Sequence, residues 1–279
     1  MIDVKLKKFV REVFPKGNIV AFTGAGISYE SGIPTFRGKG GLWERYDPEL
    51  FATPEGLAHV LHNDPGRMRA FMVETFSVLL AAHPNPAHLA LAGLEKAGLL
   101  NGVITQNVDD LHRRAGSRSV AELHGNCFRI RCPRCQSRIM LERERVAEMV
   151  KLLQMPSDKD EARSLAHIKD RYFPKCRCGG RFRTDVVLFG ETLPEEEMEK
   201  AYRMLDGCCV LLVVGSSLSV FPAASFPMHA KQRGAAVIEI NLEPSEQAGL
   251  ADYRAFGSAG EVLTEVLNAV RIRGRIVQD

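Results

Sequence analysis

The sequence has no long hydrophobic run. Among its 279 residues no apolar stretch approaches the roughly 20 residues that a membrane-spanning helix needs. The first residues, Met1 to Lys5, carry charges with no apolar stretch after them, so they lack the pattern of a signal peptide. Internal repeats and low-complexity tracts are also missing. We therefore expect a cytoplasmic protein without a membrane partner.

Net charge is low as well. A formal charge of +3 does not by itself imply nucleic acid as a partner, although residues 271–275 are locally basic, so we expect no direct contact with nucleic acid. With 45% hydrophobic residues the chain can bury one large core, or one core and a small satellite module. The sequence leaves the oligomeric state open, and a monomer is favoured.

Seven cysteines cannot all pair in disulfides within one chain, which fits a reducing compartment. Four of them form a Cys-x-x-Cys, Cys132 and Cys135, and a Cys-x-Cys, Cys176 and Cys178, set among prolines, arginines and glycines. Two such turns can each present two thiolates to one ion, which is the arrangement of a closed tetrahedral zinc site. We predict structural zinc there; the alternative is four unrelated surface thiols.

Short apolar runs alternate with helical patterns along the chain. The runs that suit buried parallel strands are Ile19–Phe22, Gly102–Thr105, Val210–Val214 and Ala236–Asn241. Helices are expected over 87–95, opened by Asn85-Pro86, and over 222–233, closed by Gly234. This alternation predicts an α/β fold: a doubly wound, Rossmann-like parallel sheet that binds its ligand beyond the carboxyl ends of the strands.

Two segments interrupt the alternation. Residues 37–83 are rich in helical patterns with no strand, and residues 127–183 hold the four cysteines and a charged helical stretch over 141–153. We predict that this helical insertion and this zinc-binding module pack together as a small domain. The Rossmann-like domain would then comprise residues 1–36, 84–126 and 184–279.

A glycine turn follows the first predicted strand. Gly24-Ala25-Gly26 is not the common Gly-x-Gly-x-x-Gly fingerprint, because Tyr29 occupies the third glycine position. The turn can still bring backbone N–H groups against a pyrophosphate, and Ser28 adds a hydroxyl. Taken alone, it could be a plain tight turn. Gly215-Ser216-Ser217 follows another strand in the same way, and two such loops favour a dinucleotide held across the sheet.

His124 is the strongest candidate for chemistry. It lies between Leu123 and Gly125, close in sequence to the polar cluster of Gln106, Asn107 and Asp109, and an unperturbed imidazole pKa near 6.5 suits a general base at neutral pH. His112 competes for this role, but its position resembles a helix start, so we assign it a structural role.

These motifs, in this order, resemble the sirtuins, the NAD-dependent protein lysine deacylases, from Ile19 to about Leu267. The resemblance implies that His124 is the catalytic base, with Asn107 and Asp109 beside it, and that zinc is structural. Implied cofactor-binding residues are Gly24, Ala25, Gly26, Ser28, Phe36, Arg37, Gln106, Asn107, Asp109, Gly215, Ser216, Ser217, Asn241, Leu242, Glu243 and Ala259. The segments 185–191 and 217–220 resemble two strand-like edges between which an acyl-lysine peptide adds as a third strand.

The implied reaction consumes NAD⁺. The acyl oxygen of the modified lysine attacks the ribose, nicotinamide leaves, and His124 then activates a ribose hydroxyl, so that the products are free lysine, nicotinamide and O-acyl-ADP-ribose. Two enzymatic alternatives are transfer of ADP-ribose to protein and hydrolysis of NAD⁺. A third alternative is a zinc-ribbon nucleic-acid adaptor without catalysis, suggested by the arginines around the first cysteine pair.

Departures from the family pattern bear on the acyl group. Thr35 and Asp110 look like the desuccinylase-type branch, but that branch reads acidic acyl chains with a Tyr-x-x-Arg pair. The matching positions hold Met72 and Thr75, neither of which offers a cation. We expect an apolar pocket that takes acetyl and longer apolar chains. The other implied substrate-binding residues are Val186, Val187, Phe189 and Gly190.

Overall fold

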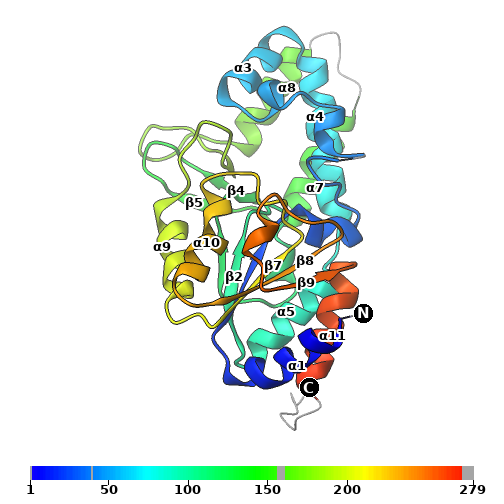
Figure 1. Cartoon of the computed structure of the whole chain (residues 1–279). Helices are drawn as coiled ribbons and strands as arrows, with labels where there is room; N and C mark the ends of the chain where they lie inside the picture. Colours follow the sequence, from blue (N-terminus) through cyan, green and yellow to red (C-terminus); the bar gives the residue numbers. More distant parts are fainter. Residues whose placement is uncertain (1, 39, 156–160, 272–279) are drawn as a thin grey trace.

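A six-stranded parallel sheet forms the centre of the computed structural model, which describes residues 2–38, 40–155 and 161–271 (Figure 1). Its strands, in spatial order, are β3 (Val120–Glu122), β2 (Leu100–Thr105), β1 (Ile19–Thr23), β7 (Val210–Val214), β8 (Ala236–Asn241) and β9 (Tyr253–Phe256). Every neighbouring pair is parallel. The order runs outward in opposite directions from β1 and β7, which makes this pair the topological switch point of the sheet.

Helices cover both faces of this sheet. Ala21 packs with α1 (Val4–Val13), α5 (Pro86–Lys96) and α11 (Ala259–Arg271) on one face. Its neighbour Phe22 points the opposite way and packs with α9 (Glu195–Leu205) and α10 (Phe226–Gln232). Because both faces are buried, β1 and β7 are apolar along their length rather than alternating. The predicted doubly wound α/β fold is confirmed.

The two interrupting segments pack against each other. Residues 40–83 form α2 (Pro48–Phe51), α3 (Pro54–Asn63) and α4 (Pro65–Ala81) without a strand; the later segment adds α7 (Arg143–Gln154) and α8 (Glu161–Tyr172). Phe51, Phe76, Met149 and Tyr172 belong to one buried cluster. Figure 1 shows α3, α4 and α8, which come from different parts of the sequence, grouped at one end of the molecule beyond the sheet, with α7 lower, at the level of β4.

Local sequence explains where these helices begin. Asp47, Thr53 and Asp64 each precede a proline and each accept a hydrogen bond from a backbone N–H of the first turn. Proline suits the first helical position because its missing N–H has no partner there in any case. Asn85-Pro86 starts α5 in the same way, as the sequence predicts.

The second sheet is small and antiparallel, in the order β5 (Arg138–Met140), β4 (Gly125–Arg131) and β6 (Arg183–Val186). The remaining short elements are α6 (Leu111–Arg114) and the 3₁₀ turns η1 (Phe14–Lys16), η2 (Ala25–Ser31), η3 (Leu42–Glu44), η4 (Ala223–Ser225) and η5 (Ala248–Leu250).

The four predicted strands are confirmed as β1, β2, β7 and β8. The edge strands β3 and β9 were not predicted from the sequence, because they are only three and four residues long and give no clear apolar run. The helix expected over 222–233 divides into η4 and α10. From residue 272 on, the basic segment 271–275 lies outside the described residues. Among the described residues, no helix is long and apolar enough to cross a membrane.

Candidate active site

Two glycine loops meet at the switch point of the sheet. The N–H of Gly26, in the turn after β1, donates to the carbonyl of Gly215, after β7, over 2.8 Å. A Cβ atom on Gly24 would lie 2.8 Å from the Gly215 carbonyl oxygen, and Gly215 itself has a φ of +61°. Side chains at these positions would therefore force the two loops apart. Their close contact leaves bare backbone facing the space above the strands.

A cavity of about 1340 Å³ opens there, between the carboxyl ends of the strands and the small helical region formed by α2, α3, α4, α7 and α8. The glycine loops, Gln106, Asn107 and His124 line it on the sheet side. Placement in the crevice at a switch point is what a dinucleotide needs in an open α/β sheet. Of the implied cofactor residues, those that line this cavity are Gly24, Ala25, Gly26, Phe36, Arg37, Gln106, Asn107, Gly215, Ser216, Ser217, Asn241, Leu242, Glu243 and Ala259.

Ser28 and Asp109 lie behind the cavity wall rather than on it. Both are nearly fully buried, and the Ser28 hydroxyl donates to Asp109 Oδ2 over 2.6 Å. The Asn107 amide donates to the Gly24 carbonyl over 3.0 Å and to Ser28 Oγ over 3.1 Å. Burial raises the pKa of Asp109, against the lowering effect of its hydrogen bonds from Ser28 and Leu111. This cluster ties the β1 loop to the β2 loop, so its members fix the shape of the pocket from behind.

The imidazole of His124 has a defined tautomer. Its Nδ1 lies 3.0 Å from the carbonyl oxygen of Gln106, and since a carbonyl can only accept, Nδ1 carries the proton. Nε2 is then the nitrogen with a free lone pair. Burial lowers the pKa of His124 below 6.5, against the raising effect of the Gln106 carbonyl, so the ring is neutral at pH 7. A neutral imidazole lining the cavity can accept a proton.

His112 does not line the large cavity, and its structural role stays a prediction. Its side chain is 2% exposed, away from the large cavity, and Nε2 contacts Thr23 Oγ1 over 2.9 Å. Burial, followed by repulsion from His88, holds the pKa of His112 well below 6.5.

The two segments expected as substrate edges both line the cavity. Strand β6 covers only the start of the first one, and beyond it the Val187 N–H donates to the His124 carbonyl over 3.0 Å and the Phe189 N–H to the Ala52 carbonyl over 2.7 Å. Val186, Val187, Phe189 and Gly190 are all on the cavity wall. Residues 217–220 are irregular backbone, with Leu218 at a φ of +55°, and Ser217 and Val220 line the same cavity.

Apolar side chains extend the cavity into the small helical region. Met72 and Thr75 on α4 line it together with Phe71, and Leu165 faces them from α8. Arg67 lies over the Phe51 ring, and Arg69 donates to the carbonyls at the end of α7, so neither guanidinium is on the lining. Lys169, whose side chain is exposed on α8, lines the cavity, as does Arg183.

The loop that carries Phe36 and Arg37 is held by its own backbone. Phe36 stacks on Trp43 with 5.4 Å between ring centroids, and the N–H groups of Leu42 and Trp43 donate to the carbonyls of Thr35 and Phe36. Asn241, the last residue of β8, donates to the Ser216 carbonyl over 3.0 Å. The implied cofactor residues therefore converge from loops after β1, β2, β7 and β8.

Asn85 has a role that the sequence pattern did not reveal. Besides starting α5, its amide donates to the Ile27 carbonyl over 2.7 Å and to Ser31 Oγ over 3.0 Å. It thus holds the glycine-rich turn from outside. The only sequence signal was an Asn cap that has two N–H donors to spare.

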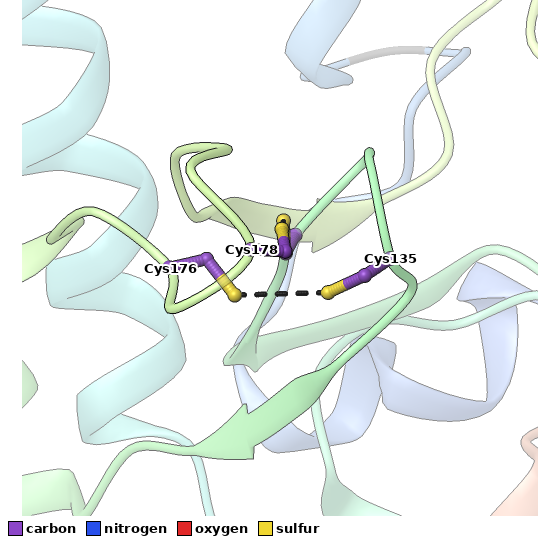
Figure 2. A group of neighbouring side chains, drawn as sticks. Cys135, Cys176 and Cys178 are labelled. Atoms are coloured by element: carbon purple, nitrogen blue, oxygen red, sulfur yellow. Dashed lines mark hydrogen bonds between the residues drawn. The ribbon is translucent and has the colours of Figure 1, made fainter.

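The four predicted zinc ligands come together. Their sulfur atoms all lie within 4.8 Å of one another, with 3.6 Å from Cys132 to Cys178 and 3.6 Å from Cys135 to Cys176. Figure 2 shows the Cys135 and Cys176 sulfurs facing each other across the gap between the two turns. A tetrahedral zinc ion with bonds near 2.3 Å requires sulfur atoms about 3.8 Å apart. The residues fit a closed four-thiolate zinc site.

Fold and site together define a Rossmann-like dinucleotide-binding protein with a four-cysteine module. Residues 24–222 match the Sir2 family, and the chain belongs to this family. The NAD-dependent protein deacylase of Pyrococcus abyssi is 46% identical over 255 residues, which cover 91% of this chain and 93% of that protein.

Solved structures agree with this assignment. A Sir2 homologue in complex with NAD is 40% identical, with a TM-score of 0.75 and coverage of 98% of this chain and 95% of that one. A Sir2 variant with a deacetylated p53 peptide and 3′-O-acetyl ADP-ribose is 31% identical, with a TM-score of 0.74 and coverage of 96% and 98%.

Proposed function

We propose that the protein is an NAD-dependent protein lysine deacylase that transfers the acyl group to ADP-ribose. The observation that carries this proposal is His124: a neutral imidazole with its proton on Nδ1 lines a cavity at the switch point, and its carbonyl accepts from the candidate peptide edge. Family membership and the names of the relatives support the same activity.

The residues on the sheet side fit NAD⁺. Bare backbone at Gly24, Gly26 and Gly215 suits the pyrophosphate, while the Gln106 and Asn107 amides suit the nicotinamide half. When bound, NAD⁺ supplies the ribose carbon that accepts the acyl oxygen as nicotinamide leaves. Asn107 and Asp109 act from the loop after β2, with Asp109 buried behind the wall, where it fixes Ser28 and the glycine turn.

His124 Nε2 then takes the proton from a ribose hydroxyl, whose oxygen attacks the acyl carbon. Because Nδ1–H already donates a hydrogen bond to the Gln106 carbonyl, the ring cannot change to the other tautomer without losing that hydrogen bond. The charge that the ring gains in this step is stabilised by the same carbonyl.

The acyl-lysine enters between residues 186–190 and 217–220, and its acyl group points toward Met72 and Thr75. We infer that acetyl and longer apolar groups are accepted. Zinc held by the four cysteines has no open coordination position, so its role is to fold the module. The division into a NAD-binding domain of residues 1–36, 84–126 and 184–279 and a small domain of 37–83 and 127–183 is part of this proposal.

Substrates of this enzyme are proteins that carry acyl-lysine. A cytoplasmic location, a monomeric state and the lack of direct nucleic-acid binding stay predictions.

The direct test is mass spectrometry of an acetyl-lysine peptide incubated with the enzyme, with and without NAD⁺. We expect deacetylated peptide, nicotinamide and O-acetyl-ADP-ribose in equal amounts, only with NAD⁺ and not with His124→Ala. ADP-ribose without loss of acetyl would identify an NAD⁺ hydrolase instead.

A further inference from the structure

His124 lies in the turn between β3 and β4, and two buried polar side chains meet across that turn. Asn126, in β4, donates from its amide to Glu122 Oε1, at the end of β3, over 2.8 Å. Both side chains are almost fully buried. A hydrogen bond between the Asn126 and Glu122 side chains therefore closes the turn that holds His124. The shape of this turn depends on the position of the Glu122 carboxylate.

Arg129 holds Glu122 from the far end of β4. Its NH1 group donates to Glu122 Oε2 over 2.8 Å, and its Nε donates to Asp185 Oδ2 over 2.5 Å. Asp185 is 1% exposed and lies in β6, directly before the cavity-lining Val186 and Val187. One guanidinium thus joins β3 to β6. Strand β3 precedes the turn that holds His124, here called the catalytic turn, and β6 leads into the proposed peptide-binding segment 186–190, here called the peptide edge.

The backbones of β4 and β6 are closely packed at the same place. Gly125 has a φ of +82°, and a Cβ atom there would lie 1.9 Å from the Asp185 carbonyl oxygen. The Val187 N–H donates to the His124 carbonyl. Catalytic turn and peptide edge are in direct contact, so a shift of β6 displaces His124.

We propose that Arg129 is a positioning residue, which by bridging Glu122 and Asp185 fixes the His124 ring against the peptide-binding edge. The inference rests on the proposed deacylase function. A guanidinium can donate to both carboxylates at once in a fixed planar fork, whereas the lysine ammonium is a point charge on a flexible stem and fixes no such geometry.

Three arginines contact Asp185, namely Arg129, Arg131 and Arg138, and Arg138 provides a matched control for Arg129. Arg138 approaches Asp185 Oδ2 at 3.3 Å, but its other partner is the exposed Glu196 rather than Glu122. Arg138→Lys keeps a positive charge near Asp185, removes the fixed guanidinium geometry at that position and leaves the Arg129 bridge intact. If these arginines only neutralise a buried carboxylate, Arg129→Lys and Arg138→Lys should behave alike.

The reaction has two steps that report separately on the base. In the first, the acyl oxygen bonds to the ribose carbon as the bond to nicotinamide breaks, and labelled nicotinamide can re-enter by the reverse step. Only the second step needs His124 Nε2. Loss of His124 positioning should therefore slow single-turnover deacylation while nicotinamide exchange continues, whereas general damage should slow both.

For Arg129→Lys we expect single-turnover deacylation of an acetyl peptide to fall at least about tenfold, with exchange and melting temperature nearly unchanged, because small misplacements of a catalytic group cost large rate factors. Arg138→Lys should leave both rates near those of the unaltered enzyme. Equal loss of both steps in Arg129→Lys, an equal loss in Arg138→Lys, or no loss at all would overturn the inference.

Glu122→Gln provides a second variant. Its amide has one acceptor oxygen for the three side chains that donate to Glu122, namely Asn126, Arg129 and Arg113, so deacylation should again fall selectively. Failure of both Arg129→Lys and Glu122→Gln to fold would show a structural role alone and overturn the inference. An unaltered enzyme that neither deacylates nor exchanges would instead disprove the proposed function itself.

Discussion

Acyl-chain selectivity offers the sharpest test of the site, because it depends on a few side chains in the apolar branch of the cavity. Met72, Thr75, Phe71 and Leu165 line this branch. Each methylene buried there contributes about 0.8 kcal/mol, so butyryl-lysine gains up to about 1.6 kcal/mol over acetyl-lysine, or roughly tenfold in kcat/KM. A succinyl carboxylate buried without a cationic partner costs about 3–5 kcal/mol, which is a loss of roughly 10²- to 10⁴-fold.

The assay is kcat/KM for acetyl, butyryl and succinyl forms of one peptide. We expect butyryl at least equal to acetyl, and succinyl lower than acetyl by a hundredfold or more. The double substitution Met72→Tyr with Thr75→Arg should raise succinyl turnover, since it installs a cation in the pocket. Comparable succinyl and acetyl turnover by the unaltered enzyme would refute the reasoning. Lys169→Met would then show whether this lining lysine is the cation responsible.

Three further outcomes are expected. His124→Ala should abolish deacylation while NAD⁺ still binds in calorimetry, because the base acts after NAD⁺ is seated; near-normal product formation would remove His124 from the mechanism. Since burial lowers the His124 pKa below 6.5, deacylation rates should hold through neutral pH and fall only when acid protonates the ring, so an acid limb centred above pH 6.5 in a kcat/KM profile would contradict the assigned environment. Cys132→Ser or Cys176→Ser should give zinc-poor protein with a lower melting temperature; one zinc ion per chain in either variant, measured by a stoichiometric metal assay, would contradict a four-cysteine site.

Much of the fold could be predicted from local pattern. Fully buried parallel strands appear as unbroken apolar runs, and β1 and β7 do so because helices cover both faces of the sheet. Asn85-Pro86 and the spacing of the four cysteines likewise depend on chemistry that acts within a few residues. The strands β3 and β9 could not be found in this way, because short edge strands owe their pairing to β2 and β8 rather than to their own residues.

For the site, the sequence by itself determined which groups are available: the glycine turns, the amides of Gln106 and Asn107, the imidazole of His124 and the four thiols. Tertiary structure decided which of them face the cavity. Ser28 and Asp109 lie behind its wall, bonded to each other, although they share a motif with residues that line it. The tautomer of His124 and its burial depend on the Gln106 carbonyl and the packing around the ring. The Arg129 bridge joins carboxylates 63 positions apart, at 122 and 185, and only chain folding brings such groups within hydrogen-bond distance.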